Sequence, residues 1–131
     1  MHPSDIKILV VDDEKVVSAN LTAFLEDEGF SVLSAASGEE ALDMLSEQDV
    51  DIGIIDMRLP GIDGNTLILK AHNMHPLMKF LIHTGSTNYG LPQSLMDIGI
   101  GSRQVLRKPL PDLSVLTRAL DELITGEHSD D

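Results

Sequence analysis

The chain has 131 residues, of which 42% are hydrophobic and 24% are charged, a composition typical of one globular domain with a single core. Twenty-two acidic residues against nine basic ones give a formal net charge of −13, and this field repels the phosphates of nucleic acids and anionic membrane surfaces. The sequence contains no cysteine, which excludes disulfide scaffolds, thiolate metal sites and thiol nucleophiles.

The two ends of the chain differ from the part between them. The first residues, Met1-His2-Pro3-Ser4-Asp5, lack the basic region and the long apolar run of a signal peptide, so we expect a cytoplasmic location. Residues 126–131 are small and acidic, and we expect them to form a tail or the start of a linker. A single domain is expected over residues 5–125.

Apolar periodicity alternates between two patterns along the chain and predicts five strands, each followed by a helix. Short, mainly apolar runs predict strands at residues 6–11, 31–36, 52–55, 79–83 and 104–106. Apolar residues three and four apart predict one helix that ends at Gly29, a second over residues 38–48 and a third after the loop at 60–64. The same spacing predicts helices at residues 91–98 and 113–124. Alternation with short connections favours right-handed crossovers. The expected fold is therefore a doubly wound α/β fold, a five-stranded parallel sheet with helices on both faces.

Polar residues follow the predicted strands at the edge where open α/β sheets bind ligands. Asp12 and Asp13 follow the first strand, Asp56 the third, Thr84 the fourth and Lys108 the fifth. Each has a simpler explanation alone, as a helix cap, a turn residue or an exposed charge. Three clustered carboxylates repel one another unless a cation neutralises them. Oxygen ligands without histidine or cysteine favour Mg²⁺ as that cation.

Four motifs, in this order along the chain, resemble the receiver domain of two-component response regulators. They are the runs ILVVDDE at residues 8–14, IIDMRLPGIDG at 54–64, HTG at 83–85 and LRKPL at 106–110. The resemblance covers residues 5–125. It implies a flavodoxin-like receiver fold with the strand order 2-1-3-4-5.

The resemblance further implies a phosphorylation switch that depends on Mg²⁺. Asp56 would accept a phosphoryl group from a sensor histidine kinase or a phosphotransfer protein. Asp13 would ligate the metal directly and Asp12 mainly through water, with Asp56 and the backbone carbonyl of Arg58 as further ligands.

Two other residues complete the site that the resemblance implies. Thr84 and Lys108 would each contact a phosphoryl oxygen, and the Lys108–Pro109 peptide would be cis. The chain would act on a downstream output domain or effector protein. A homodimer through the face of the fourth helix, fifth strand and fifth helix is a further expectation.

The sequence departs from the family pattern at Val105, where receivers usually carry tyrosine or phenylalanine. That aromatic ring normally changes rotamer when the threonine moves. We therefore hypothesise that the signal passes through the Gly85–Gly90 loop and the helix after it, because glycines make a backbone easy to rearrange.

Three other functions were weighed against a phosphorylated receiver. An aspartate-nucleophile hydrolase carries an Asp-x-Asp pattern, but the third position here is Arg58. A flavodoxin-type module needs a hydroxyl- and glycine-rich phosphate loop where this chain has Asp12-Asp13-Glu14. A receiver-like interaction module that works without phosphorylation stays open as the alternative. We expect no enzymatic activity beyond self-catalysed aspartyl phosphorylation and dephosphorylation.

Overall fold

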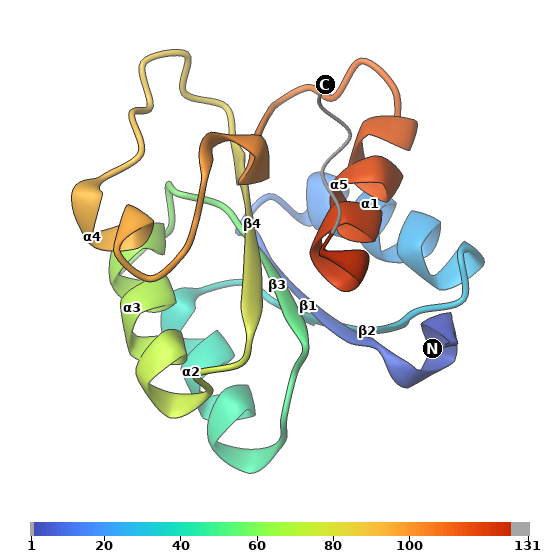
Figure 1. The fold of residues 1–131 in the computed structure, drawn as a ribbon, viewed down its shortest axis with the longest axis horizontal. Coiled ribbons are helices and arrows are strands. Elements are labelled where there is room, and N and C mark those ends of the chain that lie inside the picture. The colour runs from blue at the N-terminus through green and yellow to red at the C-terminus, as the bar shows by residue number, and fades with distance from the viewer. Residues whose placement is uncertain (1, 127–131) are drawn as a thin grey trace.

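A computed structural model describes residues 2–126 of the chain. Its five parallel strands form one sheet in the order β2-β1-β3-β4-β5, with helices on both faces (Figure 1). The predicted fold class and strand order are therefore confirmed.

The strands are β1 (Lys7–Val11), β2 (Ser31–Ala35), β3 (Ile52–Ile55), β4 (Lys79–Thr84) and β5 (Val105–Arg107). The helices are α1 (Lys15–Asp27), α2 (Gly38–Glu47), α3 (Gly64–Met74), α4 (Gln93–Met96) and α5 (Ser114–Thr125). Apart from Gly126, the expected acidic tail lies outside the described residues.

The sheet separates two apolar clusters because successive side chains of a strand point to opposite faces. Leu9 and Val11 of β1 belong to the cluster that includes residues of α2 and α3, whereas Ile8 and Val10 belong to the cluster that includes residues of α1 and α5. These two pairs of helices cover opposite faces of the sheet (Figure 1). Both faces of the central strands are buried, which explains why β1 and β3 read as nearly continuous apolar runs.

Helix α4 is shorter than the predicted helix over residues 91–98. A residue that precedes a proline disfavours the helical conformation, and Leu91 precedes Pro92. Pro92 is the N-cap of α4, so the helix begins only at Gln93. At the other end, the amides of Ile98 and Gly99 bond to carbonyls three residues back, and Gly99 takes a φ of +101°. Proline on one side and a left-handed glycine on the other leave a single turn of helix.

Strand β5 begins one residue later than predicted, at Val105, because Gln104 belongs to a short 3-10 turn over Ser102–Gln104. The side chain of Gln104 donates from Nε2 to the backbone carbonyl of Phe80 at 2.9 Å. The Gln104 side chain thus bonds to a β4 carbonyl that the backbone of a longer β5 would otherwise bond to.

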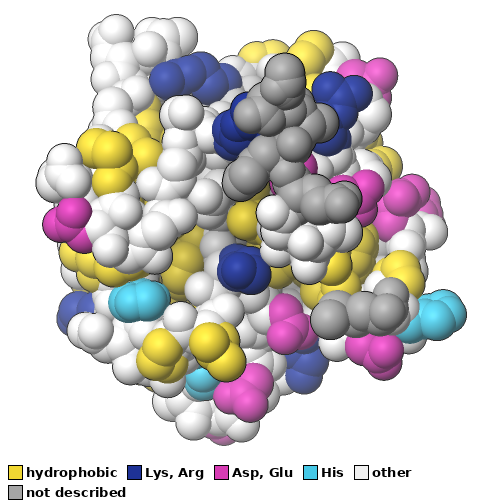
Figure 2. Space-filling view, in the orientation of Figure 1, with side chains coloured by type: hydrophobic (Ala, Val, Ile, Leu, Met, Phe, Trp, Pro, Cys, Tyr) yellow, Lys and Arg dark blue, Asp and Glu magenta, His cyan; other side chains and the backbone are white. Residues whose placement is uncertain are grey.

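Figure 2 shows apolar, acidic and basic side chains interspersed on the face viewed in Figure 1. Within residues 2–126, none of the helices combines the length and the apolar character needed to cross a membrane.

Gly64, the first residue of α3, lets that helix approach the end of β3 closely. A Cβ at this position would lie 2.6 Å from the carbonyl oxygen of Asp56 and 2.8 Å from Cα of Met57. Because both neighbours are backbone atoms, a side chain would displace α3 or the segment that carries Asp56.

We expect Gly64→Ala to lower the free energy of unfolding by about 1–3 kcal/mol, through overpacking. Urea unfolding measures this loss. Gly90→Ala is the matched control, because nothing lies within 4 Å of a Cβ there, and its unfolding free energy should change by less than about 0.5 kcal/mol. Equal stability of the two variants would contradict the close approach.

Candidate functional site

The candidate site lies at the carboxyl ends of the two central strands. Asp12 follows β1 directly and Asp56 follows β3 directly, and the amide of Asp56 continues the sheet by donating to the Val11 carbonyl at 2.9 Å. Asp12 is 3% exposed and Asp56 is 4% exposed, whereas Asp13 is exposed. The backbone of the sheet therefore fixes two buried carboxylates side by side, with a third at the surface.

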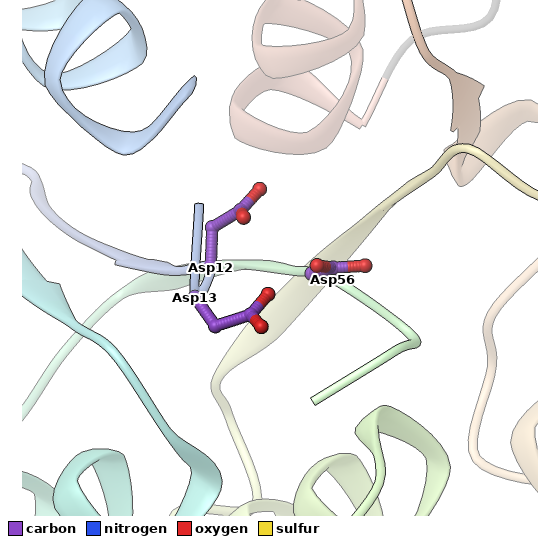
Figure 3. Close-up of side chains that lie close together, drawn as sticks. All are labelled: Asp12, Asp13 and Asp56. Carbon is purple, nitrogen blue, oxygen red and sulfur yellow. The ribbon is translucent and has the colours of Figure 1, made fainter. Parts of the chain in front are cut away.

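Asp12, Asp13 and Asp56 each place a carboxylate oxygen within 4.8 Å of the others (Figure 3). Three negative charges at this separation repel one another in a site that is partly shielded from water. The donor set consists of carboxylate oxygens alone, which suits a hard divalent cation such as Mg²⁺. The residues present therefore fit the metal that the sequence predicted.

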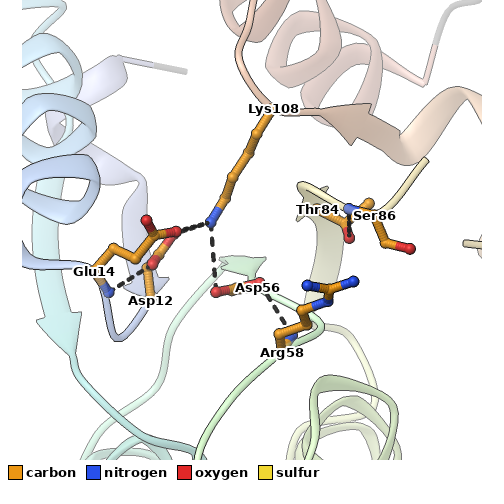
Figure 4. A network of polar contacts seen from close by, with 7 residues as sticks. All are labelled: Asp12, Glu14, Asp56, Arg58, Thr84, Ser86 and Lys108. Atoms are coloured by element: carbon orange, nitrogen blue, oxygen red, sulfur yellow. Dashed lines mark hydrogen bonds and ion pairs between the residues drawn. The ribbon is translucent and has the colours of Figure 1, made fainter.

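Lys108 brings a positive charge to the same carboxylates from the segment after β5. Its Nζ lies 3.0 Å from Asp12 Oδ2, 3.0 Å from Glu14 Oε1 and 3.4 Å from Asp56 Oδ2 (Figure 4). Burial alone would lower the pKa of Lys108, but the Asp12, Glu14 and Asp56 carboxylates outweigh it and the pKa is raised. The lysine is therefore a firmly held ammonium. The Lys108–Pro109 peptide is cis, as the resemblance implied.

Asp56 is held through both carboxylate oxygens. Oδ1 accepts the backbone N–H of Arg58 at 3.0 Å, and Oδ2 faces the Lys108 ammonium (Figure 4). Burial raises the pKa of Asp56, and the negative charge of Asp12 adds to this effect, while the bonds from Arg58 and Lys108 oppose it. Desolvation makes the carboxylate a stronger nucleophile than one in water, and the two donors fix its orientation.

Thr84, the last residue of β4, is fully buried, and its Oγ1 accepts the backbone N–H of Ser86 at 3.1 Å (Figure 4). A hydroxyl has one proton to donate and two lone pairs. In the part of the chain that the structure describes, Thr84 Oγ1 acts only as an acceptor. Its proton is therefore available to an oxygen that enters the site.

The structure brings together the five side chains that the sequence selected: Asp12, Asp13, Asp56, Thr84 and Lys108. For Arg58, the backbone N–H donates to Asp56, whereas the resemblance implied a role for its carbonyl. The contacts of two residues were not predicted. Glu14 also pairs with Lys108, and Arg107 bonds to the carbonyls of Ser86 and Tyr89. The position of Glu14 directly after two aspartates could have indicated its pairing with Lys108. The contacts of Arg107 could not be predicted in this way, because its acceptors are backbone carbonyls and these leave no signal in the sequence.

The chain is similar to proteins of one family. The family model described as "Response regulator receiver domain" matches residues 8–121. Regulatory protein VanRc of Enterococcus gallinarum is 29% identical over 117 residues, which are 89% of this chain and 49% of that protein. Sensor kinase CckA of Brucella abortus is 38% identical over 80 residues, which are 60% of this chain and 8% of that protein. The chain spans about half the length of the curated regulators that it matches, 47–49% of three of them.

Two solved structures share the fold over nearly all of their length. The receiver domain protein of Methanospirillum hungatei is 28% identical and superposes with a TM-score of 0.79, covering 92% of this chain and 94% of that one. The response regulator TrrA of Thermotoga maritima, solved in complex with Mg²⁺ and BeF, is 26% identical with a TM-score of 0.79, covering 90% and 98% respectively.

A histidine lies buried on the other face of β4, next to the site. His83 is 5% exposed, and neither ring nitrogen has a hydrogen-bond partner within residues 2–126. Burial lowers the pKa of His83, and the positive charge of Lys108 lowers it further, against the opposing effect of Asp12 and Glu14. His83 is therefore neutral, and its ring nitrogens have lost water without gaining a partner.

We expect His83→Leu to raise the free energy of unfolding at pH 7.5 by about 1–3 kcal/mol, because it removes unpartnered buried polar atoms at similar volume. In the wild type, the unfolded chain takes up a proton on His83 near its usual pKa of about 6.5, while the folded chain does not. Stability is therefore lost as pH falls through about 6.5, by at most ~1.4 kcal/mol per pH unit.

Urea unfolding from pH 7.5 to pH 5.5 measures this loss, and His83→Leu should flatten it. His72→Leu, a substitution of a histidine on α3, should retain the wild-type slope. A parallel decline in the wild type and in His83→Leu would show that other groups cause the acid sensitivity.

Proposed function

Because this chain belongs to the response regulator receiver domain family, we propose that its Asp56 carboxylate accepts a phosphoryl group. The observation that carries the proposal is the pair of contacts on Asp56, which orient a buried carboxylate between the Arg58 N–H and the Lys108 ammonium. In the transfer, a carboxylate oxygen bonds to phosphorus while the bond from phosphorus to the donor breaks, and the electron pair leaves with the donor. The product is an acyl phosphate on Asp56.

The other site residues have roles that follow from charge. Phosphoryl transfer is mostly positioning and charge neutralisation. We infer that the Lys108 ammonium pairs with one phosphoryl oxygen and that the Thr84 hydroxyl donates to another. Asp12, Asp13, Asp56 and the Arg58 carbonyl would hold Mg²⁺, which when bound supplies positive charge to the transferring oxygens.

The phosphoryl donor in this proposal is a sensor histidine kinase or a phosphotransfer protein, and the reader of the switch is an output domain or an effector protein. Family membership and the regulators among the relatives support both. We place the reaction in the cytoplasm, which the lack of cysteine permits. The homodimer through α4, β5 and α5 also remains a proposal, although the single turn of α4 gives that face little helical surface.

The contacts of Asp56 also bear on the rival functions. A hydrolase of the Asp-x-Asp type needs an acid two residues after the nucleophile to protonate the leaving group. That position holds Arg58, and a guanidinium is far too weak an acid for this step. A receiver-like module that works without phosphorylation would need Lys108 only to neutralise the buried carboxylates, and it would leave the undonated proton of the Thr84 hydroxyl without a role. We therefore infer a signalling domain whose chemistry is limited to its own phosphorylation and dephosphorylation.

We expect acetyl phosphate with Mg²⁺ to add one phosphoryl group to the chain, seen as a single mass increment in intact mass spectrometry. Asp56→Asn should abolish the adduct, because an amide is neutral and a poor nucleophile. Asp51→Asn, a substitution of an aspartate at the opposite edge of the sheet, is the matched control and should keep it. An adduct that persists in Asp56→Asn would refute the assignment.

We also expect Mg²⁺ to raise the melting temperature, because it binds the folded site and relieves repulsion between the three carboxylates. At a free Mg²⁺ concentration of about 100 times the dissociation constant, the gain would be about 2.7 kcal/mol. Asp13→Ala should remove most of the shift, and without Mg²⁺ this variant should be at least as stable as the wild type. Glu14→Gln leaves the aspartates in place and should keep the shift. An undiminished shift in Asp13→Ala would mean that Mg²⁺ binds elsewhere.

A further inference from the structure

The loop between β4 and α4 is attached to β5 by the side chain of Arg107. Its Nη1 donates to the Ser86 carbonyl at 2.7 Å, and its Nη2 donates to the Tyr89 carbonyl at 3.2 Å. A guanidinium presents its donors in a rigid planar fork, so two acceptors held at once fix the orientation of the loop. We call these two contacts the Arg107 clamp.

Tyr89 and Leu91 of this loop pack against the core, but its two glycines have no side chains to hold them. A Cβ at Gly85 would find only Lys108 atoms at 3.8–3.9 Å, and one at Gly90 would find nothing within 4 Å. The Tyr89 hydroxyl adds an attachment to α3 by donating to Asn65 Oδ1 at 3.1 Å. Glycines leave the backbone many conformations, so the clamp restricts a loop whose own packing contacts come from Tyr89 and Leu91.

The clamp reaches the candidate site through Ser86. The carbonyl of Ser86 is held by Arg107, and its N–H donates to Thr84 Oγ1 at 3.1 Å. Thr84 and Arg107 are also opposite each other in the β4–β5 ladder. Thr84, Ser86 and Arg107 therefore close a ring of backbone pairing and two side-chain contacts around the end of β4.

This ring determines which way the threonine hydroxyl can donate. With the Ser86 N–H on one lone pair, the proton of Thr84 Oγ1 is directed away from Ser86. We propose that Arg107 is a positioning residue for phosphoryl transfer, which holds Ser86 so that the Thr84 hydroxyl is oriented toward a phosphoryl group on Asp56. This inference rests on the proposed function of Asp56 and Thr84. It assigns the ordering of this loop to Arg107 in a chain that has Val105 at the usual aromatic position.

The test is the rate of phosphorylation by acetyl phosphate at saturating Mg²⁺, measured by intact mass. Arg107→Gln should lower the limiting rate roughly tenfold, because a misplaced donor stabilises the transferring group poorly. The Mg²⁺ concentration that gives half the rate should not change, because the three aspartates are untouched. Arg107→Lys keeps the charge but loses the fork, and its rate should also fall.

Arg103→Gln is the matched control for charge. Arg103 is four residues from Arg107, and its guanidinium pairs with Glu122 of α5 at 3.8 Å, so this substitution removes one positive charge nearby without removing the clamp. It should leave the rate at the wild-type value. An equal fall in Arg103→Gln and Arg107→Gln would mean that net charge, and not the clamp, sets the rate.

A double-mutant cycle separates positioning from general loosening of the fold. If Arg107 acts through the threonine, Arg107→Gln should have no further effect on the rate of Thr84→Ala. A further tenfold fall in the double variant, or a wild-type rate in Arg107→Gln alone, overturns the inference. A wild-type chain that takes up no phosphoryl group, or an adduct that survives Asp56→Asn, overturns the proposed function instead.

Discussion

The structure depends most on how negative charge is balanced at the carboxyl edge of the sheet. Asp12 and Asp56 are nearly buried because they continue the two central strands, and a buried carboxylate is stable only when it is paired or bonded. Lys108 provides that pairing with one ammonium between Asp12, Glu14 and Asp56. The position of β5, which carries the lysine to the edge, is therefore tied to the charges on β1 and β3.

The same balance makes the site responsive. A lysine shared among three carboxylates has alternative partners. Under the proposed function, a cation at the aspartates or a phosphoryl group on Asp56 would redistribute its contacts without leaving it unpaired. Thr84 complements it from β4 with a hydroxyl proton that has no acceptor among the described residues. Anionic oxygens entering between these two groups would meet an ammonium and a hydroxyl, both held in place before they arrive.

The segment Arg107-Lys108 connects this chemistry with the surface. Successive side chains of an extended segment point to opposite sides, so Lys108 faces the carboxylates while Arg107 faces the loop after β4. The backbone N–H of Lys108 also bonds to the Thr84 carbonyl at 2.7 Å. Three residues at the ends of two neighbouring strands thus link the acidic site, the threonine and the β4–α4 loop. A change of charge at Asp56 has a short physical route to the surface.

The sequence by itself determined the order of strands and helices, the doubly wound fold and the convergence of Asp12, Asp56 and Lys108. It could do so because periodicity reports burial and because the carboxyl ends of parallel strands share one edge. Tertiary structure decided the pairing of Lys108 with Glu14 across 94 positions, the clamp of Arg107 on Ser86 across 21, and the single turn of α4. The two side-chain contacts join segments that are distant in the sequence, and the acceptors of the Arg107 clamp are backbone carbonyls, a group that every residue has. Because a backbone carbonyl is the same in every residue type, the sequence does not indicate which carbonyl will accept, and only the packing of the folded chain decides it.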